Sequence, residues 1–177
     1  VMISLTEIKK EDMEYIYKWF SDSEFLKYYD YYPPHPLTKT EVDKMFDYYE
    51  KSSKSKVFAV RKDKRIIGVA GFDDIIKENQ VATLFIGLGN ENERGKGHGK
   101  EAMRILLEFG FNDLNFHRIQ LNVLEFNDKA IALYERCGFR KEGVLREFVL
   151  RDGKRYNLVL YGLLKNEWIK KNESRGH

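Results

Sequence analysis

Cysteine is nearly absent from this sequence, since Cys137 is the single one among 177 residues. One cysteine excludes an internal disulfide framework and is typical of proteins that fold in a reducing compartment. No N-terminal signal peptide is recognisable, and no apolar run approaches the roughly 20 residues that cross a bilayer. From these absences we expect a cytoplasmic protein that has no membrane partner.

An excess of one charge is also missing, because 31 basic side chains stand against 28 acidic ones, for a formal net charge of +3. The sequence contains no long basic run, so a nucleic-acid partner is not expected. Its four histidines and its lone cysteine show no metal-ligand spacing, so we expect no metal. What is present is a globular composition, 42% hydrophobic and 14% aromatic, for which we expect one domain spanning residues 1–177.

The N-terminal part is predicted to hold a strand, two helices and an aromatic loop. The strand covers residues 2–8, and the helices cover 12–20 and 40–49, where apolar residues recur at helical spacing. Between the helices, residues 25–32 are rich in aromatic side chains and lead into residues 33–36, which hold all three prolines. We therefore expect residues 25–36 to be non-helical and exposed on at least one side.

The rest of the chain is predicted to alternate strands and helices. Three strands with short connections make an antiparallel meander, and a long helix then separates the third of them from the next strand. That separation allows those two strands to lie parallel through a right-handed crossover. A short helix and a hairpin with an Asp-Gly turn follow. In residue numbers the elements are strands 57–61, 66–72 and 81–88, helix 100–114, strand 118–123, helix 128–137, and a hairpin that turns at 151–154 and continues to 164.

A glycine-rich stretch, residues 94–99 with the sequence Arg-Gly-Lys-Gly-His-Gly, joins the 81–88 strand to the long helix. Alternating glycines let a backbone approach a ligand closely, and the start of a helix offers unpaired N–H groups and the positive end of its dipole. Arg94, Lys96 and Lys100 add positive charge at the same place. The stretch therefore predicts a site for a phosphate or a pyrophosphate.

A second motif spans residues 127–139, Asn-Asp-Lys-Ala-Ile-Ala-Leu-Tyr-Glu-Arg-Cys-Gly-Phe, with Asn127 as a helix N-cap and Gly138 after the helix end. Together with the glycine-rich stretch, it resembles the GNAT superfamily of N-acetyltransferases. The patterns of that superfamily are (Gln/Arg)-x-x-Gly-x-(Gly/Ala) and Asn-x-x-Ala-x-x-Leu-Tyr-x-x-x-Gly-Phe. The resemblance implies the α/β (α+β) GNAT fold, a mixed and mostly antiparallel sheet of about seven strands with splayed parallel central strands and flanking helices.

Within that superfamily the C-terminal half is most similar to the ribosomal-protein-alanine and spermidine N-acetyltransferases. The similarity lies in His117-Arg118-Ile119, Glu142-Gly143 and Arg146-Glu147. It implies acetyl-CoA as the co-substrate and direct attack by a primary amine, either a protein N-terminal α-amine or the amine of a small molecule. A polyamine N-acetyltransferase and a non-catalytic CoA-binding sensor stay open as alternatives. The oligomeric state stays open as well, a homodimer included.

The resemblance also implies roles for individual residues. The pantetheine amides would pair with backbone near Ile86 and Leu88, and the backbone N–H near Leu88 would donate to the tetrahedral oxyanion. Tyr134 would protonate the leaving thiolate, although its helical spacing also suits a core aromatic residue. The expected cofactor-binding residues are Ile86, Leu88, Arg94, Gly95, Lys96, Gly97, His98, Gly99, Lys100, Asn127 and Tyr134, with His98 facing solvent or phosphate.

The general base is not settled by the sequence. Many relatives carry a glutamate where this chain has Thr83, and a threonine cannot act as that base. A chain of water molecules is one alternative, and the other candidates are Asp73, Asp74, His35, Glu91 and Glu93.

We expect the acceptor to bind residues 25–36, with a contribution from the final hairpin. Residues 28–32, Tyr-Tyr-Asp-Tyr-Tyr, offer aromatic rings for cation–π contact with an ammonium group, although the same rings also suit packing on the core. Spermidine N-acetyltransferases carry an acidic cluster in this region, whereas this loop has only Asp30, with Glu24 and Glu41 flanking it. The polyamine alternative is therefore less favoured.

Overall fold

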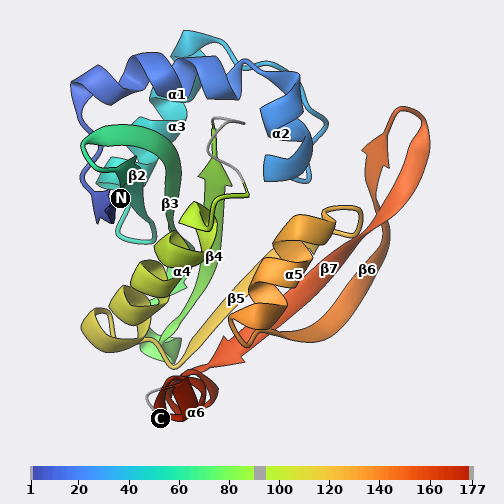
Figure 1. The fold of residues 1–177 in the computed structure, drawn as a ribbon. Helices are drawn as coiled ribbons and strands as arrows, with labels where there is room; N and C mark the ends of the chain where they lie inside the picture. Colours follow the sequence, from blue (N-terminus) through green and yellow to red (C-terminus); the bar gives the residue numbers. More distant parts are fainter. Residues whose placement is uncertain (1, 90–94, 176–177) are drawn as a thin grey trace.

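The computed structural model describes residues 2–89 and 95–175, which form one seven-stranded sheet with helices on both of its faces (Figure 1). The strand order is β1-β2-β3-β4-β5-β7-β6. In chain order the elements are β1 (Ile3–Thr6), η1 (Lys10–Asp12), α1 (Met13–Phe20), α2 (Ser23–Tyr29), α3 (Lys39–Lys51), β2 (Lys56–Lys62), β3 (Arg65–Ile76), η2 (Lys77–Asn79), β4 (Val81–Leu88), α4 (His98–Glu108), the π-helical turn η4 (Phe109–Asp113), β5 (Arg118–Leu124), α5 (Asp128–Arg136), β6 (Arg140–Arg151), β7 (Lys154–Leu164) and α6 (Lys165–Arg175).

The pairing of the strands confirms the predicted topology. Strands β2, β3 and β4 form the antiparallel meander, and β4 pairs with β5 in parallel after the crossover through α4. The β6–β7 hairpin turns at Asp152 and Gly153, whose φ angles of 50° and 76° lie in the left-handed region that the Asp-Gly turn requires. The fold is the mixed, mostly antiparallel sheet that the sequence predicts.

The prediction of a non-helical segment over residues 25–32 is wrong for its first half, because Ser23–Tyr29 forms helix α2. Asp22 starts this helix by accepting a hydrogen bond from the backbone N–H of Glu24 at 3.0 Å. Phe25 and Leu26 are buried, and their burial stabilises the helix. The prolines act only further along, where residues 33–36 are non-helical as predicted.

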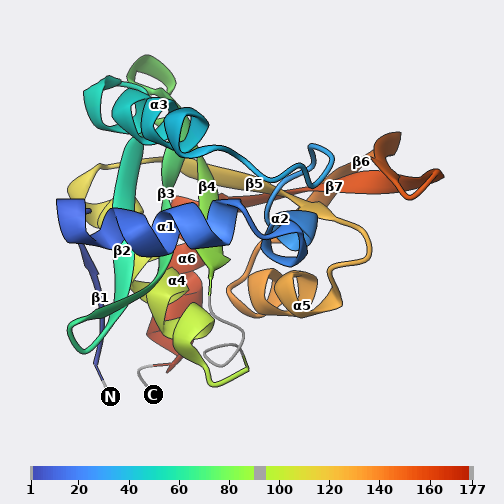
Figure 2. The same ribbon diagram turned by 90° about the horizontal axis from the view of Figure 1, so that it is seen from above.

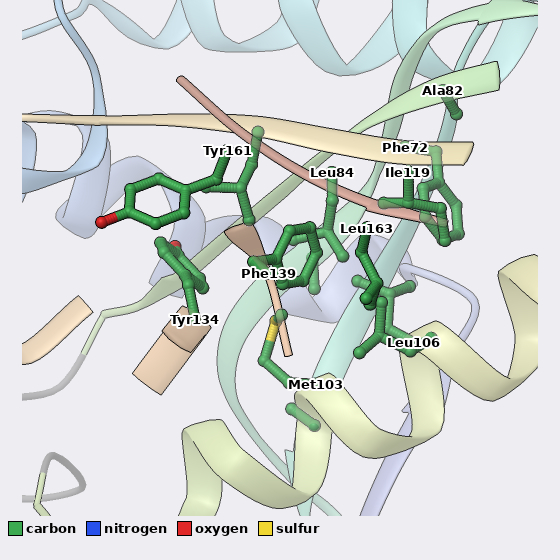
Figure 3. Packing of buried hydrophobic residues seen from close by; sticks show 14 of the residues in the cluster. Phe72, Ala82, Leu84, Met103, Leu106, Ile119, Tyr134, Phe139, Tyr161 and Leu163 are labelled. Carbon is green, nitrogen blue, oxygen red and sulfur yellow. The ribbon is translucent and has the colours of Figure 1, made fainter. Parts of the chain in front are cut away.

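Two hydrophobic clusters lie on the two faces of the sheet. One packs α4 and α5 against the central strands, and Figure 3 shows Met103 and Leu106 of α4 facing this cluster. The other packs α1, α2 and α3 against the opposite face, through residues such as Phe20 and Phe46. Figure 2 shows α3 and α4 on opposite sides of the strands. The central strands therefore present a different environment on each face.

The C-terminal segment forms helix α6, which docks onto the sheet's α4 side. Trp168 lies with its ring centroid 5.1 Å from that of Phe111, which attaches the helix to the core. Apart from Trp168 and Ile169 the helix is polar, and none of its residues is buried.

A buried ion pair ties β2 to the segment that precedes α1. Arg61 donates from Nη1 to Asp12 Oδ1 at 2.9 Å and from Nη2 to Asp12 Oδ2 at 2.6 Å, and both side chains are less than a tenth exposed. Arg61 also donates to the Thr6 hydroxyl and to the Glu7 carbonyl. Burial acts to raise the pKa of Asp12, but the hydrogen bonds from Arg61 and from the Lys9 N–H outweigh it, so the pKa is lowered.

Candidate active site

Strands β4 and β5 run side by side only at their beginnings. Their parallel ladder consists of three pairs and ends where Thr83 faces Gln120. Beyond that point β4 continues along β3 and β5 continues along β7, so the two central strands part (Figure 1). The splayed central strands that the sequence predicts are therefore present, and Ile86 and Leu88 lie in the part of β4 that no longer pairs with β5.

The glycine-rich stretch lies where β4 leads into α4. Gly95 and Gly97 adopt φ angles of 74° and 81°, and no atom lies within 4 Å of the position of a Cβ on either residue. Glycine adopts this backbone at no steric cost, and both residues are exposed, so their backbone is open to a ligand. Arg94 lies outside the described residues.

The start of α4 meets both β4 and α5. A Cβ on Gly99 would lie 3.6 Å from a Leu133 methyl carbon and 3.8 Å from one of Leu88. Lys96 and Lys100 are exposed beside this junction, whereas the side chain of His98 is buried. Of the two predicted environments for His98, solvent is therefore wrong, and contact with a phosphate stays a prediction. The glycine-rich stretch, the end of β4 and α5 thus converge on one place.

Helix α5 begins as the sequence predicts. The side chain of Asn127 caps it by accepting a hydrogen bond from the backbone N–H of Ala130 at 3.3 Å. The Asn127 amide also lies 3.5 Å from the carbonyl of Tyr28 in α2, which brings the N-terminal part of the chain to the start of α5.

Tyr134 is buried on the inner face of α5. Its ring lies edge-on to that of Phe139 at 6.1 Å, and Figure 3 shows it in the cluster beside Tyr161. Burial raises the pKa of the Tyr134 phenol to about 12, so the hydroxyl stays protonated at neutral pH. None of the described residues forms a hydrogen bond with this hydroxyl. Tyr134 is therefore part of the core, and its hydroxyl is available to donate a hydrogen bond to a ligand.

The opposite face of β4 is aromatic. Phe85 points to this face, and the ring of Tyr49 from α3 stacks on it with centroids 5.5 Å apart. Two residues further on, Gly87 leaves room for the Tyr29 ring of α2, since a Cβ there would lie 2.5 Å from a ring carbon of Tyr29. Asp73 of β3 faces Thr83 across the ladder and so shares this face.

Two carboxylates belong to this aromatic face, which we call the acceptor face and define by Tyr29, Asp30, Tyr49, Asp73 and Phe85. Burial raises the pKa of Asp30, partly offset by the backbone N–H groups that follow it and by the charge of Arg151. Burial also raises the pKa of both tyrosines, and the negative charges of Asp30 and Asp73 raise it further. The two carboxylates therefore lie close enough to both hydroxyls to act on them.

The structure separates the candidates for the general base. Asp73 lies on the acceptor face, where its carboxylate accepts hydrogen bonds from the Ser55 hydroxyl at 2.7 Å and from the Asp74 N–H at 3.0 Å. Asp74 itself is exposed, and His35 lies beside Glu41 at the start of α3. The Thr83 hydroxyl accepts a hydrogen bond from Gln120 at 3.3 Å. Glu91 and Glu93 lie outside the described residues.

Sequence reasoning missed three contributors to this region. The sequence pattern places Tyr49 in the predicted helix 40–49, Phe85 in the predicted strand 81–88 and Arg151 in the predicted hairpin turn, and it indicates no site role for any of them. Arg151 is buried and donates to the carbonyls of Asp30 at 2.7 Å and Tyr31 at 3.4 Å, which fastens the β6–β7 hairpin to the end of α2. Only the alternation of β4 could have assigned Phe85 to a face, and no sequence signal brings the other two residues to this place.

No cluster of metal-binding side chains occurs within residues 2–89 and 95–175. In the same residues no helix is long and apolar enough to cross a membrane.

A family model described as the acetyltransferase (GNAT) domain matches residues 3–140. The chain belongs to this family and is an acetyl-CoA-dependent acetyltransferase. The uncharacterized N-acetyltransferase p20 of Bacillus licheniformis is 30% identical over 169 residues, which cover 94% of each chain.

Other relatives have names that point to different acceptors. A spermidine N(1)-acetyltransferase of Vibrio cholerae is 24% identical over 97% of this chain and 98% of its own. A putative ribosomal N-acetyltransferase of Bacillus subtilis is 32% identical, over 60% of this chain and 57% of its own.

Among solved structures, the spermidine N-acetyltransferase of Vibrio cholerae in complex with CoA and spermine has the same fold. Its TM-score is 0.86 at 24% identity, over 94% of this chain and 98% of that one.

Proposed function

We propose that this acetyltransferase moves the acetyl group of acetyl-CoA to a primary amine by direct attack within a ternary complex. The observation that carries the proposal is the parting of β4 and β5 after Thr83, with the glycine-rich stretch on one side and the acceptor face on the other. A thioester held where these strands part would be accessible to an amine from the acceptor face.

The donor side offers groups suited to CoA. The exposed backbone around Gly95 and Gly97, at the start of α4, suits a pyrophosphate because backbone N–H groups and the helix dipole favour negative charge there. The pantetheine arm would lie along the backbone of Ile86 and Leu88, and Asn127 at the start of α5 would contact it. The backbone N–H near Leu88 would stabilise the tetrahedral oxyanion.

In the proposed reaction the amine nitrogen forms a bond to the thioester carbon, the C–S bond breaks, and the sulfur leaves as a thiolate. The acceptor loses one proton to a base or to water. Because the pKa of Tyr134 is about 12 and that of a thiol is about 8.5, complete proton transfer from Tyr134 to the thiolate is uphill. Tyr134 would therefore act as a hydrogen-bond donor that stabilises charge developing on the sulfur, and solvent would then protonate the thiolate.

The acceptor side suits a cationic amine. The rings of Tyr29 and Tyr49 can contact an ammonium group by cation–π interaction, and Asp73 and Asp30 complement its charge. Asp73 is the carboxylate closest in register to the parting strands, so we assign it the role of holding the amine and accepting its proton.

A polyamine acceptor is the second candidate. Two carboxylates, Asp30 and Asp73, act on the same pair of tyrosines, whereas the sequence of residues 25–36 had indicated only one. The names of relatives, a spermidine N(1)-acetyltransferase and a putative ribosomal N-acetyltransferase, support a polyamine and a ribosomal acceptor alike.

Acetyl transfer across a panel of acceptors tests the proposal. The purified chain is incubated with acetyl-CoA and, in turn, spermidine, amino acids, aminoglycosides and peptides with free N-termini, and thiol release and acetylated product are both measured. We expect acceptor-stimulated thiol release that matches the product, with one class far ahead of the others. Tight CoA binding without acetylation of any amine would favour the sensor and contradict the proposal.

Replacement of Asp73 by Asn removes the charge that the proposed role needs while keeping a similar shape. We expect kcat/KM for the amine to fall about tenfold or more, the size expected for one charge-assisted hydrogen bond, with the KM for acetyl-CoA nearly unchanged. Asp47→Asn, on the exposed surface of α3, is the matched control and should leave both constants unchanged. An equal loss in both variants would contradict the role of Asp73.

A further inference from the structure

A cavity of about 280 Å³ lies between α4, the end of α5 and the C-terminal helix α6. The residues that line it include Gly97 of the glycine-rich stretch and Trp168 and Lys171 of α6. The cavity is therefore continuous with the proposed pyrophosphate site, but it takes a large part of its lining from a segment outside both sequence motifs.

The cavity concentrates positive charge. Lys100, Arg136, Lys171 and Arg175 line it, and among the described residues none of these four forms an ion pair with a carboxylate. In the part of the chain that the structure describes, Arg136 donates to the backbone carbonyl of Ala132, and Arg175 donates to that of Arg136.

Arg104, on the same wall, differs from these four because Glu101 and Glu108 pair with it at 2.8 and 3.1 Å. The four cations surround Cys137, where burial raises the pKa of the thiol and all four charges oppose that effect. Like charges gathered in this way repel one another, and a bound anion relieves the repulsion.

Packing fixes where α6 holds its cations. The Trp168 ring lies against Phe111, which is fully buried. The aliphatic stem of Lys171 passes over Gly138, where a Cβ would lie 3.1 Å from the lysine Cδ. The ammonium group of Lys171 is therefore held by contacts along the stem, which lowers the entropy lost when it binds a ligand.

We infer that this cavity is a phosphomonoester site in which Lys171 and Arg175 of α6, with Lys100 and Arg136, bind the 3′-phosphate of coenzyme A. The inference rests on the donor named in the proposed function. Coenzyme A carries this phosphate on the ribose next to its pyrophosphate, and Gly97 of the proposed pyrophosphate site also lines the cavity. A phosphomonoester carries a charge of −1.5 to −2 at neutral pH, roughly, which suits a group of unpaired cations.

The site makes α6 a specificity element for the donor. Binding of coenzyme A then depends on its 3′-phosphate, and 3′-dephospho-coenzyme A, which keeps the pantetheine and the pyrophosphate, binds more weakly.

Calorimetric titration of the full chain with coenzyme A and with 3′-dephospho-coenzyme A tests this inference. The variants are wild type, Lys171→Gln/Arg175→Gln, and the control Lys170→Gln, which changes an exposed lysine of α6 outside the cavity. Wild type and the control should bind coenzyme A at least tenfold more tightly than the dephospho form. The double variant should bind both ligands with the affinity that wild type has for the dephospho form.

Three outcomes would overturn the inference. The first is equal affinity of the wild type for coenzyme A and its dephospho form. The second is a double variant that keeps both its thermal transition and the wild-type ratio of the two affinities. The third is binding of inorganic phosphate to protein already saturated with coenzyme A. The last outcome would identify a separate anion site. If the predicted ratio holds while no amine is acetylated, the phosphate site stands and the proposed function fails, so the two failures are distinguishable.

Discussion

Tyr134→Phe is expected to lower kcat for amine acetylation at least tenfold while the affinity for CoA changes by less than a factor of two. The variant removes one oxygen from a buried ring and leaves its contact with Phe139 in place. The hydroxyl has no protein partner among the described residues, so its loss breaks no hydrogen bond within the fold. Loss of a donor that acts only on developing charge lowers kcat and kcat/KM together.

Tyr161→Phe is the matched control for this prediction. Tyr161 belongs to the same cluster, but its hydroxyl lies 3.3 Å from a carboxylate oxygen of Glu135 and has no role in the proposed reaction. We expect it to keep turnover within twofold of wild type. Unchanged turnover in Tyr134→Phe, or an equal loss in both variants, would show that Tyr134 serves packing alone.

Asp12→Ala is expected to lower the free energy of unfolding by about 3–5 kcal/mol, because it leaves the Arg61 guanidinium buried without its counter-ion. Urea unfolding followed by circular dichroism measures the change, and Glu14→Ala, an exposed carboxylate in the same region, should change it by less than about 0.5 kcal/mol. A loss of under about 1 kcal/mol in Asp12→Ala would show that water reaches Arg61 and that the pair contributes little.

The Asp12–Arg61 pair also makes the free energy of unfolding depend on pH, with a sign that the pKa of Asp12 fixes. The pKa of Asp12 is lower in the folded chain than its ordinary value of 3.8, so its contribution is complete above that value and is lost as the pH falls through the folded pKa. Wild type should therefore lose more stability between pH 5 and acid pH than Asp12→Ala does. Parallel loss in the two proteins would contradict the assignment.

Most of the C-terminal half of the fold could be predicted from sequence because its signals are local. The helix caps at Asn127 and Gly138, the Asp-Gly turn and the alternation of β5 each depend on a few neighbouring residues. The crossover rule then gives the parallel pairing of β4 with β5, which the register confirms.

The N-terminal half was harder because its decisive contacts are distant in sequence. Helix α2 is stabilised by a cap at Asp22 and by burial of Phe25 and Leu26 in the cluster that includes residues of α1 and α3. The aromatic composition and the nearby prolines indicate a loop instead. The capping residue was the one local signal that could have corrected the prediction.

The acceptor face could not be assembled from sequence for the same reason. Tyr49, Asp73 and Phe85 come from three elements, and Arg151 reaches α2 from a hairpin more than a hundred residues away. Periodicity assigns each of them to an element but says nothing about which elements meet. The donor side was easier, since its residues fall within two short motifs.

Initial-rate kinetics with both substrates varied test the central claim most directly, using the acceptor that the panel identifies and mass spectrometry to detect the acetylated amine. Direct attack within a ternary complex predicts double-reciprocal lines that intersect, with one acetylated amine formed for each thiol released. Parallel lines, with an acetylated enzyme detectable in the absence of the amine, would contradict the account.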